Sequence, residues 1–541
     1  MKITAAHSPA LARGQGAEHS AAHSERAASS TEHGVKRLGV GWVILACLGL
    51  SAITLLFPAT PTYDPWAWLL WGREILHLDL VTDGGPSWKP LPVIFNIPFS
   101  LFGAASEPYL WLWIARAGAL LSLAMSFRLA RRIVGPGASG VIGGVFAAAF
   151  LLTTYQYVRD SMLGNSEALL AALFLWAFER HLDGRRDHAL YLGFACALLR
   201  PEVWPFLGLY GIWLWFHDPE LRLRLVLLAF AVPVLWFGPE LWGSGQPFRA
   251  SSRATNPNPG SAAFADHPGL EVGKRFLERT VIPLQLGVVI GVIAALVHFR
   301  RARRDAVILW LFGIGVAWIL LVAFMTERGY AGNQRYLVVT TAAFCVLGGI
   351  GIARVFQAIR DGVTTLSGNA RTGLAVAAGV FVIGVIGLSP VINQKVDNVR
   401  VTLDTLRYEA SLWHTLPAAI DKAGGRARLL ACGNVYSGPF QTQMVAFEMG
   451  LHGIDVGDVR PLKAQRVSPA PGVVFRTHTV PDGPLVASID DDRFREVGRS
   501  GRWQVWTAPR SDARGRSCPT AGADAPRVKP QPRTPALTSS R

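Results

Sequence analysis

Long apolar segments alternate with shorter polar segments over most of this chain. Residues 1–37 contain no apolar run, a first apolar segment covers about 39–58, and the polar stretch 59–108 follows it. A membrane core about 30 Å thick needs roughly 20 apolar residues in helical form, so the pattern predicts membrane-spanning helices. The other apolar segments lie near 109–127, 139–155, 166–179, 188–200, 203–216, 225–238, 281–298, 306–325, 336–353 and 373–391.

Two of these segments, 188–200 and 203–216, are separated only by Leu199-Arg200-Pro201-Glu202. Both outer flanks of the pair carry charged and basic residues of the cytoplasmic kind, so the chain must turn back at the proline. Counting the pair as a hairpin predicts about eleven spans. An odd number of spans places the two ends of the chain on opposite sides of the membrane.

Basic residues exceed acidic ones by 53 to 37, for a net charge of +16. In a soluble protein such an excess would suggest a nucleic-acid partner. Here the basic residues fall between apolar segments, which is typical of cytoplasmic loops. We therefore expect a plasma-membrane protein with a cytoplasmic N-terminus, lipids around its spans and no nucleic-acid partner. The clusters are Arg128, Arg131, Arg132; Arg180, Arg185, Arg186; Arg222, Arg224; and Arg300, Arg301, Arg303, Arg304.

The sequence changes character after residue 391. A helical pattern near 397–423 precedes short β-like runs at 428–432, 472–476 and 485–489, and a predicted hairpin joins 494–497 to 503–506. The fold class is therefore a polytopic α-helical membrane protein with a small C-terminal α/β extracytoplasmic domain. The expected divisions are a disordered cytoplasmic tail (1–37), a transmembrane domain (38–391), the α/β domain (392–510) and a disordered tail (511–541).

The five cysteines divide into two groups. Cys47, Cys196 and Cys345 lie in apolar segments, where a thiol acts as a small hydrophobic group. Cys432 and Cys518 follow the last apolar segment and could form a disulfide if that region is extracytoplasmic. The sequence leaves this pairing open, and it contains no CxxC or HExxH metal-binding pattern.

The polar stretch after the first apolar segment begins with Tyr63-Asp64-Pro65-Trp66. Desolvation or a bound metal can tune the basicity of a carboxylate near the membrane surface. Asp64 therefore suits a general base. The alternative is that Asp64 caps the next helix while the aromatic residues form an interfacial belt.

Other charged residues fall on the same predicted side of the membrane. Arginines can grip phosphate oxygens with two hydrogen bonds, so this set suits an anionic, lipid-linked substrate; the alternative is ordinary solvated helix ends. Arg116 lies within the second span, where a charge is costly. It either pairs with an acid such as Asp64 or Asp160 or contacts substrate. The outer set comprises Arg159, Asp160, Glu167, Arg200, Glu202 and Arg335.

The order of these features resembles the GT-C superfamily of membrane glycosyltransferases. The shared order is a first span, a loop that opens with an acid, and the Lys-Pro motif Trp88-Lys89-Pro90. A span carrying Arg116, the segment 199–202 and Asn333-Gln334-Arg335-Tyr336 follow it. The superfamily includes protein O-mannosyltransferases, aminoarabinose transferases and many actinobacterial membrane glycosyltransferases. The similarity covers the layout of most of residues 40–390, through short motifs.

This resemblance implies an inverting transfer of a sugar from a polyprenyl-phosphate donor. The acceptor would be a glycan, lipid or protein of the cell envelope on the extracytoplasmic face. Asp64 takes the base or metal-assisted role, with Asp160 or Glu167 as a second acid. Lys89, Arg335 and Arg200 are expected to contact the lipid phosphate. One departure is that Asp64-Pro65 replaces the usual acidic pair, which leaves open whether a divalent cation such as Mg²⁺ or Mn²⁺ binds at Asp64.

Two other functions compete with this interpretation. A lipid or sugar transporter, or flippase, would be expected to carry ionisable residues within its spans, and apart from Arg116 these contain few. A membrane anchor that presents the C-terminal domain as a sensor or wall-binding module would leave the polar residues of the first loop unexplained. For the enzyme, we expect the C-terminal domain to pack over the outer mouth of the spans and help to select the acceptor.

Overall fold

The computed structural model describes residues 39–154, 156–298, 303–458, 471–489, 491–509, 518–521 and 525–526. The predicted tail 1–37 and the cluster at 300–302 lie outside these residues. The chain divides into two parts, 1–46 and 47–541, and helix α2 (Val40–Thr54) begins in the first part. All that follows concerns the second part.

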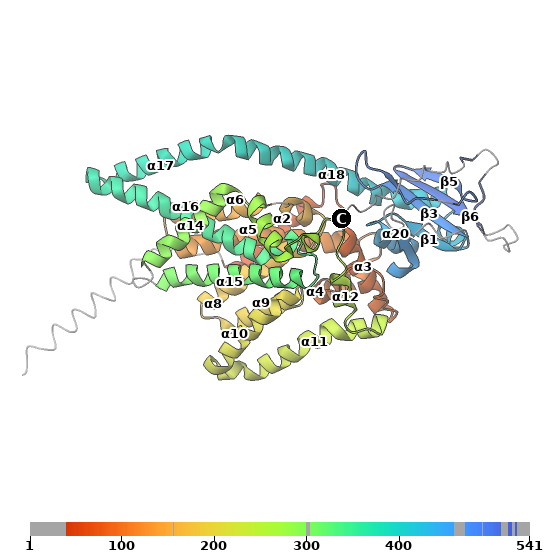
Figure 1. Ribbon diagram of the computed structural model, residues 1–541, viewed down its shortest axis with the longest axis horizontal. Helices are drawn as coiled ribbons and strands as arrows, with labels where there is room; N and C mark the ends of the chain where they lie inside the picture. Colours follow the sequence, from red (N-terminus) through yellow and green to blue (C-terminus); the bar gives the residue numbers. More distant parts are fainter. Residues whose placement is uncertain are drawn as a thin grey trace, which may run out of the picture. The chain divides into compact units, whose positions relative to one another are not determined.

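Helices make up most of this second part (Figure 1). Five described helices, namely α5, α11 with its preceding turn, α15, α16 with its preceding turn, and α17, are long and apolar enough to span a membrane. Helices α13 and α14 meet at 105° and would add a sixth span if counted together. The chain is thus a polytopic membrane protein, whereas the predicted count of about eleven spans is not confirmed.

Ten of the described helices before the C-terminal domain coincide with predicted apolar segments, whereas those over 63–76, 90–99, 157–162, 249–254 and 268–279 lie in stretches predicted as polar loops. Their bounds are α3 (Tyr63–Leu76), α4 (Pro90–Phe99), α5 (Glu107–Val134), α6 (Ala138–Leu152), α7 (Tyr157–Met162), α8 (Glu167–Leu182), α9 (Arg186–Ala197), α10 (Trp204–His217), α11 (Arg222–Ser244), α12 (Arg249–Ala254), α13 (Pro268–Arg279), α14 (Ile282–His298), α15 (Arg303–Glu327), α16 (Val338–Ser367) and α17 (Ala370–Gly387). Short 3₁₀ turns η1 (Ser100–Phe102), η2 (Pro201–Val203), η3 (Pro219–Leu221), η4 (Ala262–Phe264) and η5 (Gln334–Leu337) connect some of them.

The predicted hairpin at the proline break is confirmed. The chain turns at η2, and Arg186 at the start of α9 pairs with Asp218 just after α10, with Nη1 and Oδ1 2.8 Å apart. The same guanidinium lies 4.9 Å from the ring centroid of Trp213. Because the first residue of α9 meets the end of α10, the two helices run antiparallel.

Ion pairs join the helix ends that carry the predicted cytoplasmic arginines. Arg132 at the end of α5 pairs with Asp183 after α8, and Arg354 of α16 pairs with Asp305 at the start of α15 at 3.0 Å. Together with the pair at the end of the α9–α10 hairpin, these contacts are three arginine–aspartate pairs between neighbouring helices. Two of the basic clusters predicted from the sequence, those with Arg132 and Arg186, thus contribute ion pairs between helices.

Small residues allow α16 to lie very close to two other helices. A Cβ atom added to Gly351 would fall 1.8 Å from the carbonyl oxygen of Gly287 on α14, and one added to Gly349 would fall 2.2 Å from that of Gly143 on α6. Such backbone contacts are typical of membrane helix interfaces, where van der Waals packing drives association. They fix the position of α16, which directly follows the turn that carries Arg335.

We expect Gly351→Ala to destabilise the protein by about 1–3 kcal/mol, the usual effect of overpacking. Gly379→Ala is the matched control, because it also lies within a helix but has no atom within 4 Å of an added Cβ. Alanine should there stabilise the helix slightly. Thermal denaturation of the purified proteins measures both changes, and equal melting temperatures for the two variants would contradict the packing argument.

The C-terminal domain is built on a mixed sheet reached through the long helix α18 (Ser389–Lys422). Figure 1 shows α17 and α18 following one another toward this sheet. The strand order is β2-β1-β3-β6-β5, with β4 paired to β3; β1 is parallel to β2 and β3, whereas β6 is antiparallel to β3 and β5. The elements are α19 (Arg426–Leu430), β1 (Asn434–Ser437), α20 (Thr442–Met449), η6 (Gly453–Asp455), β2 (Val456–Asp458), β3 (Gly472–His478), β4 (Leu485–Val486), β5 (Arg495–Ser500) and β6 (Trp503–Ala508).

Most of the predicted elements of this domain are present. The helix near 397–423, the run at 472–476 and the terminal hairpin are confirmed, whereas the run at 485–489 forms a strand only over Leu485–Val486. The strand predicted at 428–432 is wrong, because 426–430 form a helix and the strand begins at Asn434. The helix buries Leu429 in the core. The glycines at 424, 425 and 433 have positive φ, so the chain turns both before and after this short apolar helix.

Cys432 and Cys518 form a disulfide bond. Both residues are buried, and Thr507 of β6 donates a hydrogen bond of 2.9 Å to the carbonyl oxygen of Pro519. The segment around Cys518 is therefore attached to the sheet. The other three cysteines are free and buried, as expected for small hydrophobic groups.

Candidate active site

Asp64 lies in the first turn of α3, whose N-cap is Thr62. The carboxylate is buried, and its Oδ2 accepts a hydrogen bond of 2.8 Å from Nη1 of Arg335. An acid in the first turn is favoured by the helix dipole, and the pair joins two segments 271 residues apart in sequence. The first-loop acid is thus held by a cation from the turn before α16.

Two further cations stand directly before prolines that begin helices. Lys89 precedes Pro90 of α4, and Arg200 precedes Pro201 of η2; both residues have extended backbone. A residue before proline avoids helical geometry, while proline fits the first helical position. The two dipeptides therefore place a cationic side chain beside a helix start at two places in the fold.

Glu167, the first residue of α8, lies between these two cations. Its Oε1 is 3.6 Å from Nζ of Lys89 and 3.7 Å from Nη1 of Arg200. Burial lowers the pKa of the Lys89 ammonium, and the charge of Glu167 opposes that shift. All three side chains are buried, so the carboxylate supplies the counter-charge that keeps both cations in place.

Aromatic rings hold the same cations from another side. The Lys89 ammonium lies 5.0 Å from the ring centroid of Trp68, one helical turn after Asp64, and the Arg200 guanidinium lies 4.2 Å from that of Tyr336. Such contacts stabilise cations by about 0.5–2 kcal/mol, with the larger values at desolvated sites. The rings thus help to place the positive charges close to Asp64.

The cluster has unused hydrogen-bonding capacity. Among the described residues, neither carboxylate oxygen of Glu167 has a hydrogen-bond partner on another side chain, and Nε of Arg200 and Oε2 of Glu202 have no partner there. Lys89 donates to Ser166 Oγ at 3.2 Å, which uses one of its three hydrogens. Because buried polar groups are nearly always hydrogen-bonded, these atoms indicate a site built to meet further polar groups.

Asp160 and Arg159 flank the cluster from α7. Arg159 Nη1 lies 3.9 Å from Asp160, and its Nη2 donates a hydrogen bond of 2.5 Å to Glu409 of α18. Burial, with a contribution from the charge of Glu167, raises the pKa of Asp160 to about 7 despite opposing effects of Arg159, Arg335 and Asn165. This carboxyl group can therefore change its protonation state near neutral pH.

We expect this shift to make the protein less stable as pH rises from about 4 to 7. The folded state keeps the Asp160 proton up to a pKa of about 7, whereas the unfolded chain loses it near the ordinary value of 3.8. The folded state thus binds more protons in this window, so stability falls as pH rises. Asp160→Asn removes the titration, and its melting temperature should decline less between pH 5 and pH 8; parallel profiles would contradict the assignment.

Arg116 lies apart from this cluster. Its Nη1 donates a hydrogen bond of 2.7 Å to the carbonyl oxygen of Thr54, and its Nη2 donates one of 2.9 Å to that of Met162. Neither Asp64 nor Asp160 is its partner among the described contacts. Carbonyl oxygens satisfy the buried guanidinium, which ties α2 and α7 to α5.

The structure brings together six of the predicted site residues, as the pair Asp64–Arg335 and the paired set Lys89, Glu167, Arg200 and Glu202. The ring of Tyr336 lies near both Arg200 and Arg335 and so connects the two sets. Arg200 and Glu202 also pair with each other at 3.4 Å. Sequence reasoning missed the supporting residues Trp68, Ser166 and Glu409. The spacing of Trp68 from Asp64 was a usable signal, since residues four apart share a helix face. Nothing in the sequence could have linked Glu409 to a loop 250 residues earlier.

The residues around Asp64 do not fit a divalent cation. Among the described residues, no group of three or more His, Cys, Asp or Glu is arranged to hold a metal ion. Mg²⁺ and Ca²⁺ prefer several oxygen ligands, whereas Asp64 is paired with a guanidinium and Glu167 lies between two cations. We therefore derive no chemical step through a metal.

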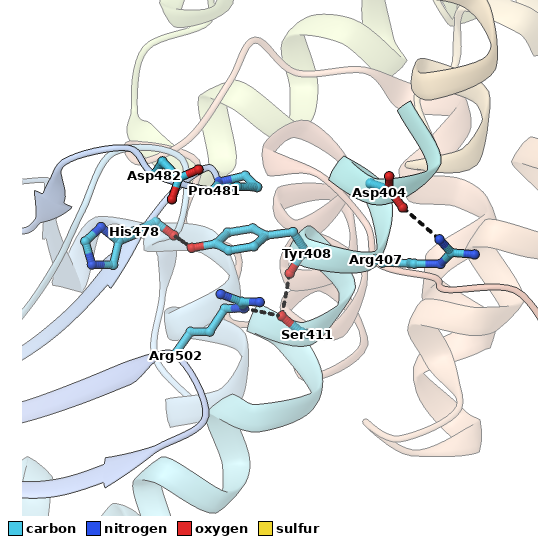
Figure 2. A pocket seen from close by; sticks show the side chains of 8 residues that line it. All are labelled: Asp404, Arg407, Tyr408, Ser411, His478, Pro481, Asp482 and Arg502. Carbon is cyan, nitrogen blue, oxygen red and sulfur yellow. Dashed lines mark hydrogen bonds and ion pairs between the residues drawn. The ribbon is translucent and has the colours of Figure 1, made fainter. Parts of the chain in front are cut away.

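Two cavities lie outside the cluster. One, of about 430 Å³, is lined by Asp404, Arg407, Tyr408, Ser411, His478, Pro481, Asp482 and Arg502. Figure 2 shows Arg502 beside the Tyr408 ring, whose hydroxyl donates to the carbonyl oxygen of His478 at 2.8 Å. The other, of about 710 Å³, is an apolar groove along α9, α10 and α11 that includes Trp204 and Pro233.

The fold and the cluster define a polytopic membrane protein with a charged, buried site against its C-terminal domain. No family model matches the chain, and no curated protein matches it. Solved structures that are similar to it include two of ArnT. ArnT from Cupriavidus metallidurans bound to undecaprenyl phosphate is 16% identical, with a TM-score of 0.49 over 87% of this chain and 99% of that one. The apo state of the same protein is 15% identical, with a TM-score of 0.47 over 87% and 98%.

Proposed function

We propose that this chain is a membrane glycosyltransferase that moves a sugar from a polyprenyl-phosphate donor to a cell-envelope acceptor. The observation that supports this most is the convergence of Asp64 and Glu167 with the cations Lys89, Arg200 and Arg335, which come from five separate parts of the sequence. An acid that can accept a proton, beside several cations, is the combination that such a reaction needs. The donor class follows from the GT-C resemblance of the motifs that carry these residues.

The proposed reaction assigns a part to each group. Asp64 accepts the proton of the acceptor hydroxyl as the acceptor oxygen bonds to the anomeric carbon of the sugar. The bond from that carbon to the phosphate oxygen breaks, and its electron pair stays on the phosphate. Lys89, Arg200 and Arg335 stabilise the negative charge that develops there. Attack opposite the leaving group inverts the configuration at the anomeric carbon.

The apolar groove supports a lipid-linked donor. It includes Trp204, two residues after Glu202 of the cluster, and continues along α10 past Leu207 and Gly211 to the α11 side chains. A polyprenyl chain is a long hydrocarbon that would gain by burying its surface there. We infer that the groove holds the lipid while the phosphate reaches Arg200.

The convergence also favours an enzyme over the two competing functions. A transporter would be expected to place binding groups along a path open in turn to both sides, whereas these residues form one cluster in contact with the C-terminal domain. For a membrane anchor, a buried set of charges with unused hydrogen-bonding atoms would be a cost without a purpose.

We also propose that the C-terminal domain is extracytoplasmic and the N-terminus cytoplasmic. The Cys432–Cys518 disulfide suits an oxidising compartment, and the paired arginines at the other end of the helices suit the cytoplasm. A reporter enzyme fused after residue 392 should therefore be active only outside the cytoplasm. Cytoplasmic activity at this fusion point would refute the proposed orientation.

The function is tested by incubating the purified chain in lipid vesicles with radiolabelled polyprenyl-phosphate sugars, one at a time. We expect one donor to lose its sugar, either to an added envelope extract or slowly to water. A protein boiled before the assay gives the background. If no polyprenyl-phosphate sugar is consumed by well-folded protein, the proposed donor class is wrong.

A further inference from the structure

The carboxyl ends of two parallel strands of the C-terminal domain lie at one edge of its sheet. Strands β1 and β2 pair in parallel, with Ser437 opposite Asp458 at their ends. The loop 438–441 follows β1 and leads into α20. In open α/β sheets, ligands bind in the crevice outside the carboxyl ends of parallel strands. This edge is therefore the first place to look for a binding site in the domain.

The edge lies against the helix that carries Asp64. The ring centroids of Phe440 and Tyr63, the residue before Asp64, are 6.1 Å apart with the planes nearly perpendicular. The side chain of Gln443 on α20 is within hydrogen-bonding reach of the Tyr63 hydroxyl. Figure 1 shows α20 beside α3. Phe440, in the loop that follows β1, thus contacts the residue next to the proposed base.

Backbone contacts fix this relative position. Arg73 of α3 donates to the carbonyl oxygens of Phe447 and Leu451, both at 3.2 Å. Trp66 packs between Trp413 and Phe447, with centroid distances of 5.3 and 5.1 Å. Because α3 and the domain share one hydrophobic core, the strand edge cannot move away from Asp64 without breaking that core.

Several neutral polar atoms at this edge have no hydrogen-bond partner in the part of the chain that the structure describes. They are Oγ of Ser437, Oε1 of Gln441 and Oε1 of Gln443, in side chains that are 0%, 6% and 2% exposed. An unmet buried acceptor costs about 1–3 kcal/mol. Amide and hydroxyl oxygens are suited to the hydroxyl groups of a sugar, whereas the phosphate of the donor needs cations.

Phe440 adds an exposed aromatic surface to these polar atoms. Its side chain is 55% exposed, and its φ of 68° lies in the left-handed region that disfavours side chains other than glycine. Such strain persists where the surroundings require the residue. An aromatic face can pack against the C–H groups of a sugar ring.

We propose that the end of β1, with Ser437, Phe440 and Gln441, forms the acceptor subsite and that the acceptor is a glycan. This inference rests on the proposed function and narrows its acceptor class. The sugar ring lies on Phe440, its hydroxyl groups meet the unpaired oxygens, and the reacting hydroxyl reaches Asp64. The domain thus selects the acceptor by direct contact.

The test uses the full chain in lipid vesicles with a radiolabelled polyprenyl-phosphate sugar as donor. The acceptor probes are the methyl glycosides of mannose, glucose, galactose and arabinose, and release of the sugar to water without acceptor is measured separately. The main variant is Phe440→Gly, because glycine relieves the positive φ and should leave the melting temperature unchanged or higher. The matched control is Leu78→Gly, another exposed apolar residue with a φ of 57°.

For Phe440→Gly we expect the KM for the methyl glycoside to rise about tenfold, the size of effect that loss of an aromatic contact gives. Release of the sugar to water should stay within about twofold of wild type. Gln441→Leu should raise the same KM, and Leu78→Gly should change neither quantity.

Three outcomes would overturn the subsite. The first is an unchanged KM for the methyl glycoside in folded Phe440→Gly. The second is a loss of sugar release to water in this variant that is as large as its loss of transfer. The third is a wild-type protein that releases the sugar to water but transfers it to no methyl glycoside. The third outcome would contradict the glycan acceptor and leave the proposed donor and reaction unaffected. If wild type catalysed neither reaction, the proposed function would be wrong, and the subsite with it.

Discussion

Asp64→Asn is expected to reduce sugar transfer by about 10²- to 10⁴-fold, the usual effect of losing a general base. Asparagine has nearly the same size, and its side-chain oxygen can still accept the hydrogen bond that Arg335 donates at 2.8 Å. The fold should therefore be kept. If Asp64 served only to begin α3, asparagine would serve as well, so the structural alternative predicts almost unchanged transfer.

The measurement is transfer from the radiolabelled donor, together with donor binding and the melting temperature. Asp83→Asn is the matched control, because Asp83 is an exposed acid of the same outer loop. We expect normal donor binding for both variants and a loss of transfer for Asp64→Asn only. Full transfer by folded Asp64→Asn would move the base role to Asp160 or Glu167, the other acids of the region.

Much of the helical part could be predicted from the sequence, because membrane spans need long apolar segments that are visible without knowing their neighbours. The hairpin at Pro201 followed from a breaker between two basic flanks, and the structure confirms it. The number of spans could not be settled in this way. Helices such as α8 and α9 are short and carry charged ends, so hydropathy alone does not separate a crossing from a packed, partly polar helix.

The members of the site were predictable as a group, whereas their pairing was not. The sequence placed Asp64, Lys89, Glu167, Arg200 and Arg335 on one side of the membrane because each follows or precedes an apolar segment. Which acid meets which cation depends on helix packing, such as the close approach of α14 to α16 at Gly351. The role expected for Arg116 illustrates the limit: a charge within a span signals a partner, and the partners are carbonyl oxygens.

The short strands of the C-terminal domain were the hardest part to predict. Strand β1 has four residues and β2 three, too few for an alternating pattern. Both pair in parallel through connections that the sequence does not mark. The residues at their ends, such as Phe440 and Gln443, approach Tyr63 only because α3 and α20 share a core.

Arg335→Gln is expected to reduce transfer by about 10²- to 10³-fold, as loss of one group that stabilises developing charge does in other enzymes. Arg335 is the only one of the three cations that hydrogen-bonds Asp64 in the described contacts. Arg335→Lys keeps the charge without the planar fork and should lose less activity. Arg328→Gln is the matched control, because this arginine lies seven residues earlier, is exposed and stacks on Phe324 at 5.0 Å.

The double variant Asp64→Asn/Arg335→Gln separates two roles of this arginine. If Arg335 only positions Asp64, the double variant should be no slower than Asp64→Asn alone, because residues that act as a unit are not additive. If Arg335 also contacts the donor phosphate, as we propose, the two losses should partly add and the KM for the donor should rise. Transfer rates and donor KM values for wild type, the two single variants and the double variant decide between these two roles. An Arg335→Gln variant as active as Arg328→Gln would show that Arg335 is not part of the site.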